Sequence, residues 1–218
     1  MTEKIILKNE YVNSKIIRIL QKRKIKNLIH FTNIKNLESI LQLGICTRRY
    51  LRENEIKYEY NDPLRKDRRR DCSSFSIEYP NTSYLFKLIN NTDNKFCIII
   101  LDAEKLLPNI QDKYYVYCNA ATTEARSYLS SETLTQPKFL ENMFYDSKIS
   151  YLPKDVQSEV LIKGNVSTKY IQEIHFMNNA DLEEFKNICK KLDFENKYTF
   201  KVSDFYFKDR EQINWVKR

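Results

Sequence analysis

The spacing of apolar residues along the chain predicts a mixed succession of helices and strands. A basic N-terminal helix is expected over about residues 13–25, with Asn13 or Ser14 as its cap, because apolar side chains recur there at helical spacing. Short apolar runs predict the strands, which are expected at residues 28–31, 73–77, 95–101, 114–117, 159–163 and 171–176, with one or two more within 198–207.

Capping residues and helix breakers place the remaining helices. Thr32 or Asn33 is expected to begin a helix that ends at Gly44, since glycine commonly closes helices. The other helices are expected around Leu85 after the Pro80-Asn81 break, from Asp102 to Leu107 before Pro108, and over residues 137–145 and 181–192. Because strands and helices do not alternate regularly, their order favours an α+β fold over a doubly wound parallel sheet.

Length and glycine content limit the classes of fold and site. The 218 residues, 42% of them apolar, suit a single domain over residues 1–218. The chain has 2 glycines, Gly44 and Gly164, so neither a G-x-G-x-x-G motif nor a phosphate-binding P-loop can be formed. Any nucleotide must therefore be held by side chains and by ordinary backbone.

The basic composition has two explanations. A formal net charge of +8, with 15 tyrosines and 12 phenylalanines, suits a polyanionic partner, because cations bind phosphates and rings stack on bases. A general bias toward Lys, Ile and Asn explains the same charge. On charge alone, the compositional bias is the slightly better explanation.

Cysteine usage and hydropathy indicate the compartment. The 5 cysteines include no C-x-x-C pair and the chain has 2 histidines, so no metal site is expected. This pattern is typical of a reducing compartment. No apolar run approaches the length of a membrane span, and the N-terminus does not resemble a signal peptide. The sequence therefore predicts a cytoplasmic protein without a membrane segment.

A long basic segment, residues 46–72, is predicted to be a loop with at most one helical piece. Near its end stand Arg65, Arg68, Arg69 and Arg70. Such a density of arginine suits a pyrophosphate or a DNA backbone, because the guanidinium binds phosphate oxygens through two parallel hydrogen bonds. A solvated, charged loop explains the same residues equally well.

Several polar residues stand at the ends of predicted strands. His30 is placed to hydrogen-bond a ribose hydroxyl and Thr32 an amide, although for His30 alone a core histidine is the better explanation. Glu159 opens an apolar strand, where a carboxylate is costly unless it is paired or functional, and alone it suits an edge position in water. Gln157 lies on the same side of that strand if the strand has begun. Asn119, before two alanines, is a weak signal alone.

Taken together, four segments resemble the DarT family of DNA ADP-ribosyltransferases over roughly residues 26–176. The similar segments are His-Phe-Thr-x-x-x-Asn-Leu-x-x-Ile-Leu-x-x-Gly at 30–44, Arg-x-Asp followed by Ser-Ile-x-x-Pro-Asn at 65–81, Asn-Ala-Ala at 119–121, and Gln-x-Glu-Val-Leu at 157–161. Arg68 replaces the glycine expected shortly after Arg-x-Asp. Alignment on Ser76 selects Arg65 as the arginine of the motif.

The resemblance implies an ADP-ribosyltransferase fold, with two small packed β-sheets around an NAD cleft and surrounding helices. It implies NAD as a substrate, no metal, and Glu159 and Arg65 as catalytic residues, with Glu159 bonded to the ribose 2′-hydroxyl. By the same resemblance, the expected cofactor-binding residues are His30, Thr32, Asn36, Arg65 and Ser76. The expected substrate-binding residues are Gln157, Arg68, Arg69, Arg70 and Asn119.

The resemblance also implies a toxin that modifies a base in single-stranded DNA and is countered by a DarG-like macrodomain antitoxin. Two alternatives remain open. One is an ADP-ribosyltransferase acting on RNA or protein, because Gln-x-Glu does not separate these acceptors. The other is a non-catalytic nucleic-acid-binding protein, which would release no nicotinamide and would be indifferent to Glu159→Gln.

Overall fold

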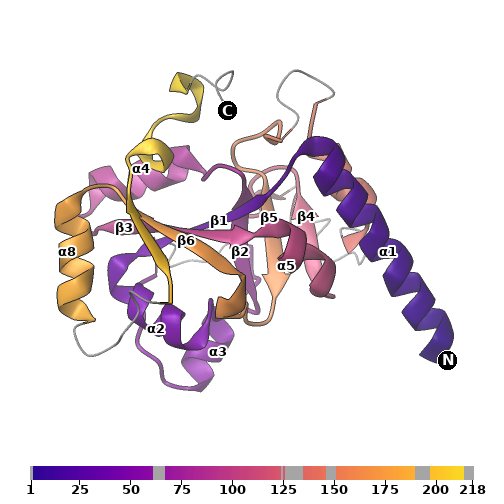
Figure 1. The fold of residues 1–218 in the computed structure, drawn as a ribbon, viewed down its shortest axis with the longest axis horizontal. Coiled ribbons are helices and arrows are strands. Elements are labelled where there is room, and N and C mark those ends of the chain that lie inside the picture. The colour runs from indigo at the N-terminus through magenta and orange to yellow at the C-terminus, as the bar shows by residue number, and fades with distance from the viewer. Residues whose placement is uncertain are drawn as a thin grey trace.

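The computed structural model describes residues 2–60, 67–123, 125, 135–145, 151–189 and 197–213 (Figure 1). The strands are β1 Asn27–Asn33, β2 Cys72–Ile77, β3 Phe96–Asp102, β4 Lys113–Val116, β5 Glu159–Lys163, β6 Ile171–Phe176 and β7 Thr199–Val202. The helices are α1 Thr2–Arg23, α2 Leu37–Leu43, α3 Arg48–Glu53, α4 Thr82–Asn91, α5 Ala103–Asn109, α7 Pro137–Asn142 and α8 Asn179–Ile188. Short 3-10 helices are Ile34–Asn36, Thr168–Tyr170, Phe205–Phe207 and Arg210–Gln212. This irregular order confirms the predicted α+β class.

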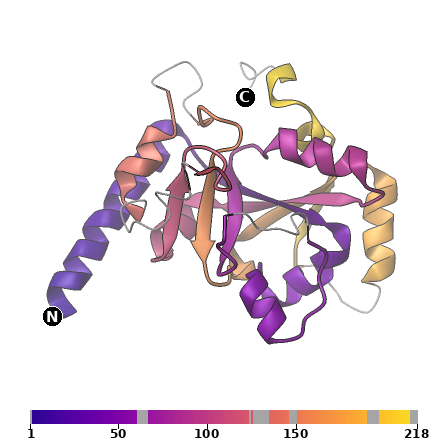
Figure 2. The same cartoon turned by 180° about the vertical axis from the view of Figure 1, so that it is seen from behind.

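The strands form one hydrogen-bonded sheet of 7 strands in the order β4-β5-β2-β1-β3-β6-β7. Neighbours are antiparallel, except that β6 and β7 are parallel. The sheet has two halves, the β5 half (β4-β5-β2) and the β3 half (β1-β3-β6-β7), whose strands run across one another in Figures 1 and 2. These halves correspond to the two expected small sheets, and they remain joined where β1 meets β2.

The junction between the halves is short. β1 pairs with β2 only through Leu28 opposite Ile77 and Ile29 opposite Ser76, whereas β1 pairs with β3 along its whole length. Beyond Ile29 and Ser76 the register ends and the two strands diverge. The backbone of each strand is then open to other partners.

A buried glutamate reinforces this junction at the end of β2. Glu78 accepts hydrogen bonds from the Asn27 N–H (2.7 Å), from Asn27 Nδ2 (3.0 Å) and from the Lys26 N–H. Its backbone has a φ of 60°, which is uncommon for a residue with a side chain. Three donors offset the desolvation of the carboxylate, so Glu78 holds the start of β1 against the end of β2.

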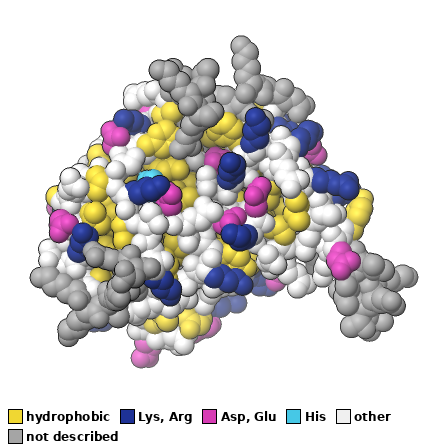
Figure 3. All heavy atoms as spheres, in the orientation of Figure 1, with side chains coloured by type: hydrophobic (Ala, Val, Ile, Leu, Met, Phe, Trp, Pro, Cys, Tyr) yellow, Lys and Arg dark blue, Asp and Glu magenta, His cyan; other side chains and the backbone are white. Residues whose placement is uncertain are grey.

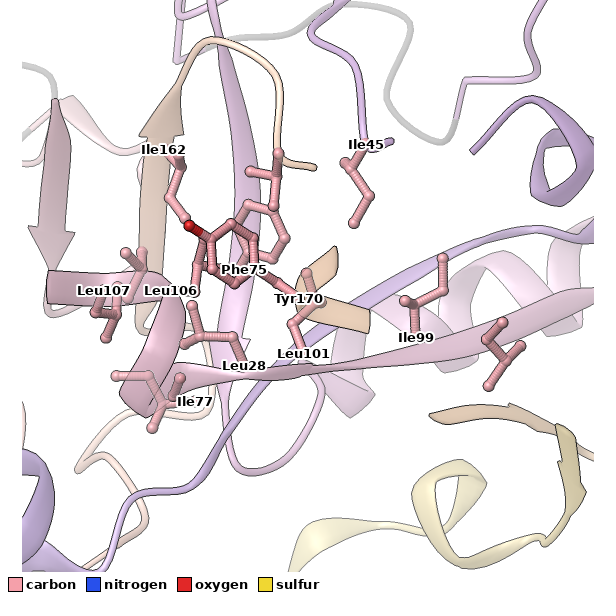
Figure 4. Packing of buried hydrophobic residues seen from close by; sticks show 14 of the residues in the cluster. Leu28, Ile45, Phe75, Ile77, Ile99, Leu101, Leu106, Leu107, Ile162 and Tyr170 are labelled. Atoms are coloured by element: carbon pink, nitrogen blue, oxygen red, sulfur yellow. The ribbon is translucent and has the colours of Figure 1, made fainter. Parts of the chain in front are cut away.

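The core lies where the two halves face each other. Leu28 and Leu101 of the β3 half pack in the same cluster as Phe75 and Ile162 of the β5 half (Figure 4). All four side chains are at most 1% exposed. Burial of an apolar side chain of this size contributes about 1.5–3 kcal/mol, so this cluster holds the halves together far more strongly than the short pairing does.

Helices cover the sheet and frame its open side. The C-terminal part of α1 buries Ile16 and Leu20 and packs against α5 and α7, while its N-terminal end extends away from the body (Figure 1). α4 and the α2–α3 segment lie on opposite sides of β1 in both Figures 1 and 2. None of the helices in the described ranges is both long enough and apolar enough to cross a membrane.

Helices α1 and α5 extend beyond their predicted bounds, and the last predicted region contains one of the one or two strands expected there. α1 begins at Thr2 and ends at Arg23 rather than covering 13–25, because residues 2–13 contain no helix breaker and the helix propagates through them. α5 continues past Leu107 to Asn109, with Pro108 in its last turn. Only one strand, β7, forms within the last predicted region, and a 3-10 helix follows it.

The acidic and basic side chains are interspersed on the face seen in Figure 3. Lys and Arg side chains alternate there with Asp and Glu and do not merge into one continuous basic patch. Net charge alone therefore identifies no binding surface on that face.

Gly44 ends α2 with a φ of 89°, and a Cβ built on it would lie 2.3 Å from the Val166 carbonyl oxygen. Gly44→Ala is therefore expected to destabilise the protein by about 2 kcal/mol or more, from left-handed backbone strain and a clash with backbone. Gly164 is the matched control, since its φ is 81° but nothing lies within 4 Å of its Cβ position. Gly164→Ala should cost about 1–2 kcal/mol. Urea unfolding measures both, and equal losses would contradict the role of the Val166 contact.

Candidate active site

A cavity of about 810 Å³ opens beside the divergence of β1 and β2. Its volume falls in the range of about 300–1,000 Å³ that is usual for small-molecule sites. Its walls come from β1, β2, α2, α4, residues 58–60, residues 119–122 and the start of β5. The predicted site residues that line it are His30, Thr32, Asn36, Ser76, Asn119, Gln157 and Glu159.

Glu159 is the first residue of β5, and its carboxylate is held from two sides. Its Oε1 accepts a hydrogen bond from the Ala120 N–H (2.9 Å), and its Oε2 accepts one from the Ser74 hydroxyl. Strand pairing of Glu159 with Val116 fixes the backbone. The carboxylate is therefore positioned at the cavity wall before any ligand binds.

Gln157 lies beside Glu159 on the loop that enters β5. Its Oε1 accepts a hydrogen bond from Asn119 Nδ2 (2.9 Å), and Asn119 Oδ1 accepts from the Ala121 N–H (2.8 Å). The weak Asn-Ala-Ala signal of the sequence thus has a clear structural role. Asn119 orients Gln157, and the neighbouring Ala120 contributes a backbone donor to Glu159.

His30, on β1, is bonded to β2, the strand that also holds the Glu159 carboxylate through Ser74. Its Nδ1 lies 3.0 Å from the Ser74 carbonyl oxygen. A carbonyl can only accept, so Nδ1 carries the proton and donates, which leaves Nε2 as an acceptor in the neutral ring. Ser74 therefore contacts both His30 and Glu159.

Asn36 uses its side-chain amide to hold a loop. Its Nδ2 donates to the Glu59 carbonyl (2.7 Å) and its Oδ1 accepts from the Glu59 N–H (2.7 Å), while Nδ2 also donates to Thr32 Oγ1 (3.0 Å). Asn36 lines the cavity, but these bonds occupy both ends of its amide. The geometry therefore gives Asn36 a position in the wall, from which it holds the backbone of Glu59.

The loop that Asn36 holds brings aromatic and basic side chains to the cavity. Tyr58 and Tyr60 line it, with ring centroids 6.1 Å apart, and the Arg48 guanidinium lies 5.7 Å from the Tyr60 ring centre. The sequence predicted a basic loop at 46–72 that suits phosphate groups but singled out none of these three residues. The signal for Tyr58 and Tyr60 was the alternation of tyrosine with charge after α3.

Ser74 was also missed, although strand alternation contains the information. On a strand, Ser74 and Ser76 lie on one face, and Ser76 was predicted to bind the cofactor. Both line the cavity, whereas Phe75 between them is buried in the core.

Burial raises the pKa of the Cys46 thiol, so this cavity residue stays protonated at neutral pH and is not a ready nucleophile.

Of the predicted arginines, the three that the structure describes do not line the cavity. Arg65 lies outside the described residues. Arg68 and Arg70 are exposed, and the Arg69 guanidinium lies 4.6 Å from the centre of the Tyr114 ring. Arg70 instead borders a separate surface hollow with Arg49 and Arg52.

The cavity and the crossed sheet halves define a class of protein, the ADP-ribosyltransferases. A family model described as ssDNA thymidine ADP-ribosyltransferase, DarT, matches residues 29–207. The chain therefore belongs to the DarT family. A comparison with curated proteins finds no match.

Solved structures show the same fold. Thermosipho africanus DarTG in complex with ADP-ribose superposes with a TM-score of 0.58 at 17% identity, covering 84% of this chain and 51% of that one. This chain thus spans about half of the Thermosipho protein. Thermus sp. 2.9 DarT in complex with carba-NAD+ gives 0.57 at 15% identity over 84% of this chain and 98% of that one. The same protein with ADP-ribosylated ssDNA gives 0.54 at 15% identity, over 85% and 97%.

Ser74→Ala tests how Glu159 is held. It removes the hydroxyl donor to Glu159 but keeps the backbone carbonyl that accepts from His30. A hydrogen bond to a charged group contributes about 1.5–3 kcal/mol, so kcat for NAD cleavage should fall about tenfold to a hundredfold. Ser74→Thr keeps the hydroxyl and should retain most activity. Equal losses in the two variants would show that the hydroxyl is not the relevant group.

Proposed function

We propose that this protein transfers ADP-ribose from NAD to a thymidine base in single-stranded DNA. The observation that carries the proposal is the carboxylate of Glu159, held by Ser74 and Ala120 at the wall of a cavity that His30 and Gln157 also line. Membership of the DarT family and the likeness to DarT structures solved with NAD+ and with ADP-ribosylated ssDNA support the reaction and both substrates.

In this reaction the bond between nicotinamide and ribose breaks, and its electron pair leaves with nicotinamide. A positive, oxocarbenium-like ribose remains, which needs negative charge close by. Glu159 supplies that charge through a hydrogen bond to the ribose 2′-hydroxyl, as carboxylates do beside similar sugar cations in glycosidases. A ring nitrogen of the base then bonds to the ribose carbon and releases its proton to solvent.

The other cavity residues divide between contact and support. His30 and Thr32 orient the ribose and nicotinamide from β1, and Ser76 faces the nucleotide from β2. Asn36 supports the nucleotide indirectly, through the loop at Glu59 that its amide holds. Arg65 keeps its role in binding phosphate or polarising the base on the sequence resemblance alone.

The acceptor is an unstacked base, because a base within a duplex cannot reach such a cavity. Gln157 binds its edge with an amide that Asn119 orients. Tyr58 and Tyr60 offer ring faces for stacking, which is typical of single-strand binding. Arg68 and Arg70, which are exposed, and the half-buried Arg69 lie outside the cavity, where they can contact phosphates of the strand beyond the reacting base.

A partner and a compartment follow from the same proposal. DarTG of Thermosipho africanus supports a DarG-like macrodomain antitoxin as partner, and hence a toxin–antitoxin role. The free thiols of all five cysteines are typical of a reducing compartment, which supports a cytoplasmic location.

Glu159→Gln is expected to reduce transfer by about a hundredfold to a thousandfold or more, because it removes the charge that stabilises the ribosyl cation. Mass spectrometry of single-stranded oligonucleotides incubated with NAD measures the reaction, as a mass gain of one ADP-ribose. Oligonucleotides with and without thymidine identify the base.

Labelled NAD offered separately to DNA, RNA and protein distinguishes the acceptor classes. Gln157→Asn serves as a companion variant, since it keeps the amide and every charge but shortens the reach to the acceptor. Label on RNA or protein alone would overturn the DNA assignment. Full activity of Glu159→Gln would overturn the mechanism.

A further inference from the structure

The C-terminal segment, residues 198–213, packs beside the loop that leads into the site. After β7 it returns to the end of β2, where the Tyr79 hydroxyl reaches the carbonyls of Phe205 (2.6 Å) and Lys208 (2.9 Å). Tyr206 and Phe207 are buried in one cluster with Leu152. Figures 1 and 2 both show this segment at the same end of the molecule as the chain entering β5.

Arg210 makes the direct contact between this segment and the loop 153–158. Its Nη2 donates to the Pro153 carbonyl, 57 residues away in sequence. Burial lowers the pKa of the Arg210 guanidinium, while Asp155 and Glu211 oppose that shift. Arg210 is therefore half-buried, with Asp155 near enough to act on its charge. Arg210 also lies beyond residue 207, where the family match ends.

The loop passes this restraint on to Gln157. Asp155 Oδ1 accepts from the Gln157 N–H (2.8 Å), and the Asp155 carbonyl accepts from the Ser158 N–H (3.0 Å). The turn that Arg210 contacts at Pro153 therefore sets the backbone position of Gln157. From this position the Gln157 side-chain oxygen accepts a hydrogen bond from Asn119.

Glu159 does not depend on this loop in the same way. Its backbone pairs with Val116, and its carboxylate is held by Ser74 and Ala120, all of which lie outside residues 153–158. A displacement of Pro153 is therefore expected to move Gln157 more than Glu159. Gln157 and Glu159 are therefore held in place by different sets of interactions.

We propose that Arg210 is a positioning residue that holds the loop 153–158, so that Gln157 meets the acceptor base. This inference rests on the proposed function, because it assigns Gln157 to the acceptor. Arg210 then affects the reaction with the DNA acceptor, while the rest of the site binds NAD. The C-terminal segment becomes part of the acceptor site rather than a cover for the core.

Steady-state transfer to a thymidine-containing oligonucleotide, measured with the full chain, tests the proposal. Arg210→Ala should lower kcat/KM for the oligonucleotide about tenfold to a hundredfold, because a small displacement of a positioned group is costly. KM for NAD should stay within about twofold, since the interactions with NAD are retained. Arg210→Lys, which keeps the charge and one donor group, should lie between wild type and Arg210→Ala.

Lys208→Ala is the matched control on the same segment. Its side chain pairs with Asp204 at the surface, and alanine keeps the carbonyl that accepts from Tyr79. This variant should behave as wild type. A parallel loss of NAD and oligonucleotide parameters in Arg210→Ala, or no loss at all, would overturn the positioning role. Failure of the wild-type protein to modify DNA would instead overturn the proposed function.

Discussion

The short pairing between β1 and β2 is the constraint on which the rest of the structure depends. It is the hydrogen-bonded link between the two halves of the sheet, and it ends after Ile29 and Ser76. Beyond that point a strand pair would normally satisfy its own backbone. Here the Ser74 carbonyl instead accepts a hydrogen bond from the His30 ring. The same divergence that ends the sheet pairing therefore creates the cavity and brings its first polar residue into place.

The pairing of β5 explains why Glu159 can be held without a ligand. β5 stays paired on both sides, with β4 and β2, so the start of the strand is rigid. Ser74 and Ala120 then fix the carboxylate from β2 and from the turn after β4. Charge that is positioned in advance needs no reorganisation during the reaction. With both oxygens already accepting hydrogen bonds, the carboxylate suits electrostatic stabilisation better than proton transfer.

The sequence predicts the elements better than their arrangement. The hydrophobic pattern placed every strand from β1 to β6, because buried strands such as β3 contain an apolar run, here Phe96 to Leu101. The order of strands depends on long-range pairing, which no local pattern contains. Among the residues that line the cavity, His30, Gln157 and Glu159 were singled out by the resemblance. Strand alternation places Ser74 on the same face as Ser76, but its bond to Glu159 depends on the long-range pairing of β2 with β5.

Asn36 illustrates that a sequence motif does not show which contacts its residues make. It was predicted to bind the cofactor, and it does line the cavity, yet its amide is bonded to the backbone of Glu59. Two such bonds contribute about 1–3 kcal/mol, while ordering one residue of backbone costs about 1–2 kcal/mol. The Asn36 bonds thus offset the ordering of only one or two residues. The remaining order of the loop must come from its own contacts, such as the ring pair of Tyr58 and Tyr60. This wall of the cavity is therefore held by side-chain contacts, whereas Glu159 lies on a strand that is paired through its backbone.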